Sequence, residues 1–235
     1  MTLHDAMQAL QALGTAQNRK IYVRHGAGEN CFGVSFANLG KLVKQIKRDH
    51  ALACLLWTTG NADARILATM VADPGALTPR ELDDWVQSIE HYAVADAFSK
   101  LAAASPHAYD KLREWMPSTR DLTAQVGFDI LAQKASNDPE IAESLLEEQL
   151  DLIEKTIHTR KNRTRHAMNN ALIAIAFRNT RLRKMAVAAA KRIGKVEVDH
   201  GLTSCKTPDA VSYIEKSAAH YARKAATAAA KKANR

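Results

Sequence analysis

The sequence predicts an all-α fold, a solenoid in which antiparallel helix pairs stack in layers. Three observations lead to this class. Helical periodicity recurs along nearly the whole chain without convincing strand alternation, the connections are short, and three segments resemble one another. Many short helices with short turns form either a bundle or a solenoid, and the repeated segments favour the solenoid.

Helix start and stop signals divide the chain into elements. Ser35 can cap the helix that begins "FANLGKLVKQIK", and Thr78 and Thr207 each stand before a proline at a first helical position. Gly60 and the "DPG" at 73–75 are typical of helix ends and turns. The predicted helices cover 2–13, 15–24, 36–48, 50–59, 61–72, 79–89, 92–104, 107–116, 119–135, 139–159, 163–177, 180–193 and 208–228.

The similar segments are "NADARILATMVADP" (61–74), "TRDLTAQVGFDILAQKASNDP" (119–139) and "NTRLRKMAVAAAKRIG" (179–194). Each has an arginine near a helix start and an alanine-rich stripe behind it. This pattern is typical of the second helix of a HEAT-type pair, whose small residues let layers stack closely. We therefore expect one HEAT-like domain over residues 1–215, followed by an Ala/Lys-rich basic tail over 216–235.

Several conspicuous residues are assigned to packing. Trp57, Trp85 and Trp115 lie on amphipathic helices among leucines and valines, so we expect them in the core. Asp63 and Arg65, which belong to the first repeated segment, are expected to hold the repeats together.

Composition excludes several classes of protein. No apolar run approaches the roughly 20 residues that cross a bilayer, and the N-terminus lacks the basic and apolar blocks of a secretory signal. Cys31, Cys54 and Cys205 are odd in number and widely spaced, which suits reduced thiols in the cytoplasm. No Cys/His cluster has zinc spacing. We expect a cytoplasmic monomer without membrane contact, metal or other cofactor.

The charge is distributed unevenly. Residues 155–235 hold 19 Lys+Arg and 4 Asp+Glu, a net of +15, whereas residues 1–154 hold 14 and 21, a net of −7. An acidic half followed by a strongly basic half indicates a polyanionic partner, nucleic acid before an anionic membrane surface. A basic tail on an ordinary soluble protein is the alternative.

The stretch "SIEHYAVADAFSK", residues 88–100, places a carboxylate inside a helix pattern. At 100° per residue, the core stripe holds Val94, Ala97, Phe98 and Leu101. A second face carries Ile89, Tyr92, Ala93, Asp96 and Lys100. Asp96 therefore lies off the core, one turn after an aromatic ring and one turn before a lysine.

Four segments together resemble the AlkD-type DNA alkylation repair proteins: "FGVSFANLGKLVKQIK", "HALACLLWTTGNADARILATMVADP", "TPRELDDWVQSIEHYAVADAF" and "RHAMNNALIAI". The resemblance covers roughly residues 30 to 195, and "IGKVEVDHGLTSCKTPDA" is similar to a C-terminal feature of one bacterial branch. It implies a HEAT-like solenoid whose basic concave groove holds duplex DNA. Characterised members are glycosylases that release cationic N3- and N7-alkylated purines without flipping the base into a pocket.

The resemblance also implies a site made of an aspartate, two tryptophans and an arginine. The aspartate matches Asp96, and the tryptophan four residues earlier matches Tyr92. The second tryptophan matches Asn170, which is not aromatic. The arginine should fall at Ala124 or Gln125, where this sequence has none. The nearest arginine, Arg120, is about one turn earlier and is not assigned the arginine's role.

The chemistry of base release gives these residues roles. An alkylated purine already carries positive charge and leaves without a general acid, so the need is to stabilise an oxocarbenium-like sugar. Asp96 as the catalytic carboxylate can do this, and the Tyr92 ring can lie against the deoxyribose. We expect Lys100 to bind DNA. The alternative is that Asp96 only pairs with Lys100 across one turn.

The predicted helix 163–177 has the same two-faced pattern. Its core stripe is Met168, Leu172 and Ile175. The residues expected to contact DNA on and just before this helix are Arg160, Arg163, Arg165, His166 and Asn170. A solvated helix start is the alternative for "RKNRTRH".

Three functions remain open. The first is a DNA glycosylase acting on alkylated bases of double-stranded DNA, with Asp96 at its centre and the chain associated with the nucleoid when bound. The second is a catalytically silent solenoid that recognises damaged or structured DNA. The third, a protein-interaction scaffold, is disfavoured because a scaffold needs no charge of +15 in one half.

Overall fold

The structure is a computed structural model that describes residues 1–218. Within this part of the chain the regular elements are helices, and extended pairing is confined to an isolated bridge between Gly14 and Val34. The all-α class is thus confirmed. The predicted helix 208–228 is helical from 210 to 218, and residues 208–209 precede the observed helix. Residues 219–228 of that prediction, and most of the predicted tail 216–235, lie outside the described residues.

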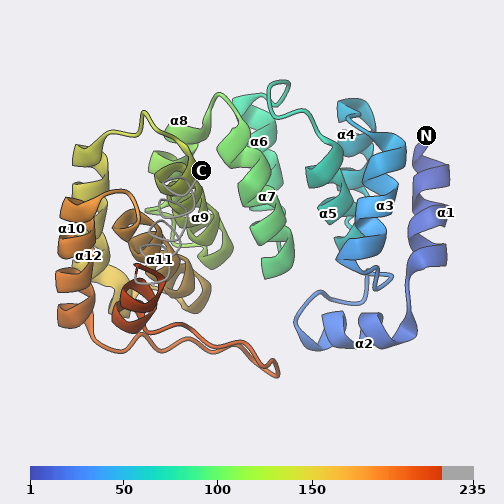
Figure 1. Cartoon of the computed structure of the whole chain (residues 1–235). Helices are drawn as coiled ribbons and strands as arrows, with labels where there is room; N and C mark the ends of the chain where they lie inside the picture. Colours follow the sequence, from blue (N-terminus) through green and yellow to red (C-terminus); the bar gives the residue numbers. More distant parts are fainter. Residues whose placement is uncertain (219–235) are drawn as a thin grey trace, which may run out of the picture. The chain divides into compact units, whose positions relative to one another are not determined.

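The chain divides into two compact units, and Figure 1 labels the helices along the chain. Unit 1 holds residues 1–131 and 200–205, and unit 2 holds residues 132–199 together with the described residues from 206 onward. Helices of unit 1 are α1 (Leu3–Leu13), α2 (Ala16–Arg24), α3 (Phe36–Ile46), α4 (His50–Thr58), α5 (Ala62–Val71), α6 (Pro79–Gln87), α7 (Tyr92–Ala104), α8 (Ala108–Trp115) and most of α9 (Asp121–Asn137). Helices of unit 2 are α10 (Glu143–Thr156), η1 (Ile157–Thr159), α11 (Asn162–Ala176) and α12 (Thr180–Ile193). That residues 1–215 act as one domain stays a prediction.

Most predicted helices agree with the observed ones within two residues, but the predicted helix 139–159 was wrong at both ends. Pro139 lies in a turn in which the Asp138 carboxylate accepts the backbone N–H of Glu140 at 3.0 Å. This turn delays the helix until Glu143. At the other end the chain tightens into the short 3₁₀ helix η1.

The core of unit 1 is built around α5, which packs against α3, α4 and α7. The predicted burial of the three tryptophans is confirmed, since Trp57, Trp85 and Trp115 are only 4%, 6% and 2% exposed. The rings of Trp57 and Trp85 stack with centroids 4.2 Å apart, and Phe98 packs against both. Trp115 also packs against Phe98, with ring centroids 6.0 Å apart, so aromatic residues of four helices meet in one cluster.

A repeated polar arrangement confirms that the chain is built from related helix pairs. The side chain of Asn61 caps α5, and Arg65 donates to the backbone oxygens of Trp57 and Ser88 at 3.3 and 2.8 Å. In unit 2 the side chain of Asn179 caps α12, and Arg183 donates to the backbone oxygen of Ala176 at 3.3 Å. In both units an Asn cap and an arginine four residues later fasten a helix to the end of the preceding one.

The buried Asp63 anchors the loop between α2 and α3. Its carboxylate accepts the backbone N–H groups of Phe32, Gly33 and Val34 at 2.6, 3.0 and 2.9 Å. Gly33 has φ of 78°, and a Cβ there would lie 2.3 Å from the backbone nitrogen of Arg19. Only glycine fits this position. Asp63 and Arg65 are therefore the packing groups that the sequence predicted.

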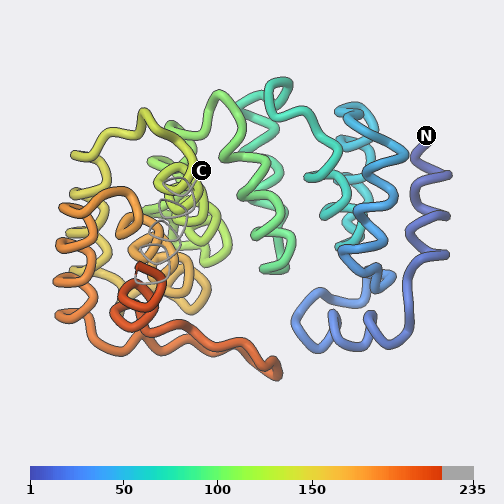
Figure 2. The backbone as a smooth tube through the Cα atoms, in the orientation of Figure 1, coloured from blue at the N-terminus to red at the C-terminus, as the bar shows by residue number. Residues whose placement is uncertain are grey.

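In unit 2, α12 packs against α10 and α11. After Gly194 the chain runs out and returns before the helix at 210–218, as Figure 2 shows. Both arms of this excursion are held by α11: Asn162 exchanges two hydrogen bonds with Asp199, and Asn169 donates to the backbone oxygen of Pro208 at 3.1 Å.

Candidate nucleic-acid interface

The two-faced helix predicted around Asp96 is α7. Val94, Phe98 and Leu101 are buried, whereas Asp96 and Lys100 are exposed. The prediction that Ile89 belongs to the second face was wrong, since Ile89 is 1% exposed. The helix begins only at Tyr92, and the preceding turn directs Ile89 into the core. The ring of His91 lies 4.8 Å from that of Tyr92 at the helix start.

Tyr92, Asp96 and Lys100 line a cavity of about 580 Å³ within unit 1. The opposite walls come from α2, α3 and α5, and include Tyr22 and Phe36. Phe36 is 57% exposed, so a large apolar side chain of the cavity lining is open to solvent. The cavity thus combines aromatic surfaces with acidic groups, Asp63 and Asp96, and with the basic Lys100.

The phenol of Tyr22 remains neutral in this cavity. Burial raises its pKa, and the nearby Asp63 carboxylate raises it further. Its hydroxyl donates to the backbone oxygen of Val34 at 2.9 Å. Tyr22 therefore offers a fixed aromatic surface to whatever enters the cavity.

A glutamine of α9 contacts the carboxylate of Asp96. The Gln125 side-chain amide donates to Asp96 Oδ1 at 2.6 Å and reaches Asp129 Oδ2 at 3.3 Å. Gln125 is 1% exposed, so this contact is sheltered from water on the glutamine side. Gln125 is one of the two positions at which the sequence resemblance placed an arginine. A neutral amide occupies that place beside the carboxylate.

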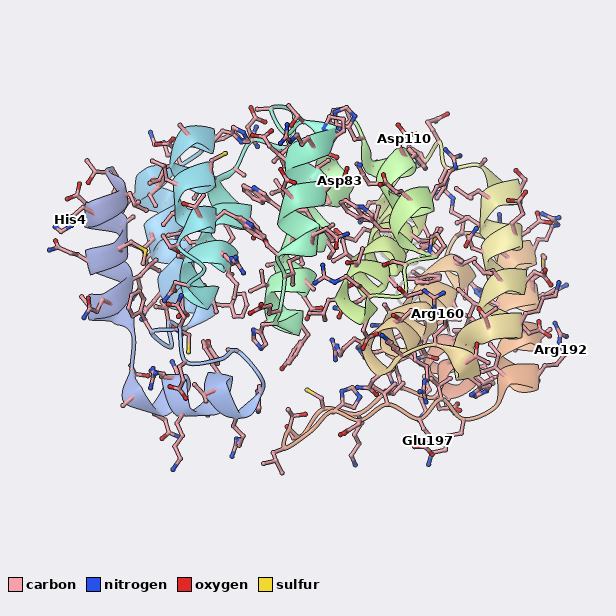
Figure 3. The ribbon with its side chains drawn as sticks, turned by 180° about the vertical axis from the view of Figure 1, so that it is seen from behind. His4, Asp83, Asp110, Arg160, Arg192 and Glu197 are labelled. Carbon is pink, nitrogen blue, oxygen red and sulfur yellow. The ribbon has the colours of Figure 1, made fainter. Side chains whose placement is uncertain are left out.

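The five residues predicted to bind DNA on and before α11 lie together in unit 2, and none is fully exposed. Arg160 directly follows η1 (Figure 3). Arg165 donates to the backbone oxygens of Glu197 and Arg160 at 2.8 and 3.2 Å. Nδ2 of Asn170 lies 3.1 Å from the ring Nε2 of His166. Arg165 thus fastens the excursion after α12 to α11. The predicted site residues therefore form two sets: Tyr92, Asp96 and Lys100 lie in unit 1, and these five residues lie in unit 2.

Exposed lysines in unit 2 were missed by the sequence analysis. Lys161, Lys184 and Lys191 are exposed and take part in no ion pair within residues 1–218. By contrast, Arg192 is held by both oxygens of Glu154 at 2.5 and 2.7 Å. The seven-residue spacing of Lys184 and Lys191 places them on one helical face, a signal that the sequence contained.

Comparison with known proteins identifies the family. The family model described as "DNA alkylation repair enzyme" matches residues 6–214. The chain belongs to this DNA alkylation repair family. Within residues 1–218 no helix has the length and apolar character needed to cross a membrane.

Relatives of this member of the DNA alkylation repair family match it over nearly their whole length. The uncharacterized proteins Lin0241 of Listeria innocua and Lmo0209 of Listeria monocytogenes are each 32% identical over 218 residues, which span 88% of this chain and 93% of theirs. A solved structure, described as "a new family of proteins related to the HEAT-like repeat DNA glycosylases with affinity for branched DNA structures", has a TM-score of 0.87 and 32% identity. The match covers 94% of this chain and 95% of that one. The HEAT-like helical fold is thereby confirmed.

Proposed function

We propose that this member of the DNA alkylation repair family is a DNA-binding protein that recognises branched or otherwise distorted duplex DNA. The observation that carries the proposal is the contact of Gln125 with Asp96. The resemblance implies that a glycosylase would have an arginine near this carboxylate, and here the partner is a neutral amide. Asn170 likewise stands where the resemblance implies the second tryptophan. Two of the four site groups that the resemblance implies are therefore absent from their matching positions.

The groups that bind a phosphate backbone are plentiful. Among the described residues, 155–218 contain 14 Lys+Arg and 4 Asp+Glu, a net charge of +10. Exposed lysines that form no ion pair release counterions when they meet phosphates, which gives affinity without sequence preference. The solved structure with affinity for branched DNA, which is 32% identical to this chain, supports a branched partner.

The cavity of unit 1 gives a reason for preferring distorted DNA. A junction or bulge exposes base faces that are stacked in a continuous duplex, and it also exposes the sugars next to them. The aromatic surfaces of Tyr22, Phe36 and Tyr92 can pack against such faces, and base–aromatic stacking contributes about 1–3 kcal/mol per base. In this proposal unit 2 provides affinity and unit 1 provides the preference for structure.

Base excision is the second candidate, and one observation favours it. Asp96 is exposed in the cavity one turn after Tyr92, so its carboxylate is accessible to a sugar. A carboxylate so placed can stabilise an oxocarbenium-like transition state for a base that already carries positive charge. This candidate requires release of N3- or N7-alkylated purine from DNA.

Binding to a four-way junction and to a linear duplex of the same sequence tests the proposal. We expect tighter binding to the junction, measured by fluorescence anisotropy in excess competitor duplex. Equal affinity for the two DNAs would contradict the preference for structure. Incubation with methylated DNA, followed by chromatography of released bases, separates the two candidates: release above the protein-free rate would make the protein a glycosylase.

A further inference from the structure

Three side chains with metal-binding atoms meet in unit 1, away from the cavity that contains Asp96. His50 and Cys54 are four residues apart on α4 and therefore share one face of that helix. Glu81 lies in the first turn of α6 and faces them. None of the three lines the Asp96 cavity. The cluster is thus separate from the site already described.

The donor atoms are spaced as ligands of one ion. His50 Nε2 lies 3.6 Å from Cys54 Sγ, and Glu81 Oε1 lies 4.0 Å from each of these atoms. A tetrahedral zinc ion with bonds of about 2.0–2.3 Å places its ligand atoms about 3.4–3.6 Å apart. Movements of about half an ångström, within the reach of side-chain rotation, would bring the three atoms to that spacing.

The backbone orients Glu81 toward the other two residues. Its Oε2 accepts the backbone N–H of Thr78 at 2.9 Å and the Thr78 hydroxyl at 2.7 Å, as part of the capping box of α6. Oε1 is left to face His50 and Cys54. A carboxylate held by a second group in this way is typical of metal sites, because the outer contact fixes the ligand.

Burial in the cluster is intermediate, as a site with one open position requires. All three residues are partly exposed, with 23% of the His50 side chain and 37% of the Glu81 side chain accessible to solvent. A water molecule can therefore reach a bound ion as a fourth ligand. Imidazole, carboxylate and a cysteine thiol that releases its proton when the metal binds suit zinc rather than calcium or magnesium, which prefer oxygen ligands alone.

We infer that His50, Cys54 and Glu81 bind a single divalent ion of the zinc type, with water completing the coordination. This departs from the expectation of a metal-free protein drawn from the sequence. The sequence did not indicate the site because only two of its ligands, His50 and Cys54, lie on one helix. The third ligand, Glu81, comes from a different helix. The ion would link α4 to α6 and stabilise unit 1, since binding to the native state alone raises its stability. The inference does not depend on which DNA the protein binds.

Titration of the reduced full-length protein with Co²⁺ tests the site without any activity measurement. A cobalt ion bound by Cys54 in a four-coordinate site should give a thiolate-to-cobalt charge-transfer band and intense visible absorption. Zn²⁺ should displace the cobalt and raise the melting temperature. We expect Cys54→Ser to abolish the charge-transfer band, and Glu81→Gln, which preserves the capping box, to weaken binding about 10–100-fold.

The exposed cysteine provides the matched control. Cys205→Ser should keep the band and its cobalt affinity, because Cys205 is not in the cluster. Absence of the band in the wild type, or its persistence in Cys54→Ser, would overturn the proposal. Should Cys54→Ser fold poorly, His50→Gln tests the same site. Equal Zn²⁺ affinity in His50→Gln and wild type, measured by competition with a chelating dye, would also overturn it.

Discussion

The carboxylate of Asp96 accepts a hydrogen bond from a neutral amide, and this partner matters for what the residue can do. Gln125 donates to Asp96 and also reaches Asp129, so two acidic side chains share one donor. An amide leaves the negative charge in place, whereas an arginine would neutralise it. This hydrogen bond by itself therefore brings no positive charge to the carboxylate, as an arginine in its place would.

Replacing Asp96 with asparagine separates charge from shape. Asp96→Asn keeps the size of the side chain and can still accept a hydrogen bond from Gln125. We expect DNA affinity to change by no more than about threefold, because the residue is exposed and the local charge is screened by salt. Any release of alkylated purine should fall about 100-fold, since the lost charge acts on the transition state. Anisotropy and base-release assays on the same preparation check both expectations; full release activity in Asp96→Asn would rule out a catalytic role.

A third carboxylate beside Asp96 should make stability depend on pH. In Gln125→Glu the new group is buried and faces Asp96 and Asp129, so its folded-state pKa should be raised above the unfolded value. Stability is then fully present below the unfolded pKa and is lost as pH rises through the folded pKa. We expect a loss of about 3 kcal/mol at pH 7 that largely disappears near pH 4, measured by urea unfolding. Gln45→Glu, at an exposed position of α3, should change stability by less than about 0.5 kcal/mol.

At the scale of elements, Asp63 connects α5 to the loop before α3. Asp63→Ala removes one acceptor and leaves the three backbone N–H groups of residues 32–34 without it. We expect the free energy of unfolding to fall by about 3 kcal/mol or more, measured by urea unfolding. Asp73→Ala removes a carboxylate that is 40% exposed and accepts the backbone N–H of Gly75, so it should cost about 1 kcal/mol or less. Equal effects of the two changes would contradict the anchoring role.

The helices could be predicted from the sequence because their signals are local. Asn179 as cap and Gly194 after the end mark α12, and its predicted bounds 180–193 are those observed. The start of α10 was missed because the turn at Asp138 depends on a hydrogen bond that periodicity does not register.

The candidate site could be predicted only in part. The sequence indicated that Asp96 lies off the core but not that Gln125 contacts it. That contact joins residues 29 apart on two helices, and it depends on how α7 and α9 pack.

At the scale of the whole molecule, the positive charge of the C-terminal half should control binding to DNA. We expect the combined replacement Lys161→Gln, Lys184→Gln and Lys191→Gln to weaken binding to all duplexes alike. The slope of log affinity against log salt should flatten by about one for each phosphate that the variant no longer neutralises. Anisotropy at several salt concentrations measures both quantities.

The matched control removes the same charge from unit 1. Lys20, Lys41 and Lys44 are exposed, and their combined replacement by glutamine changes the net charge by the same amount. It should leave the salt slope nearly unchanged. If the two triple variants lose affinity equally, net charge rather than the surface of unit 2 determines binding.

The aromatic cluster of unit 1 has a spectroscopic consequence. All three tryptophans of the chain lie in residues 1–131, and Trp57 and Trp85 are in contact. Tryptophan emission therefore reports the unfolding of unit 1 alone, whereas far-ultraviolet circular dichroism reports helices in both units. Coincident midpoints from the two signals would mean that the chain unfolds as one cooperative body, and separate midpoints would mean that each unit melts by itself.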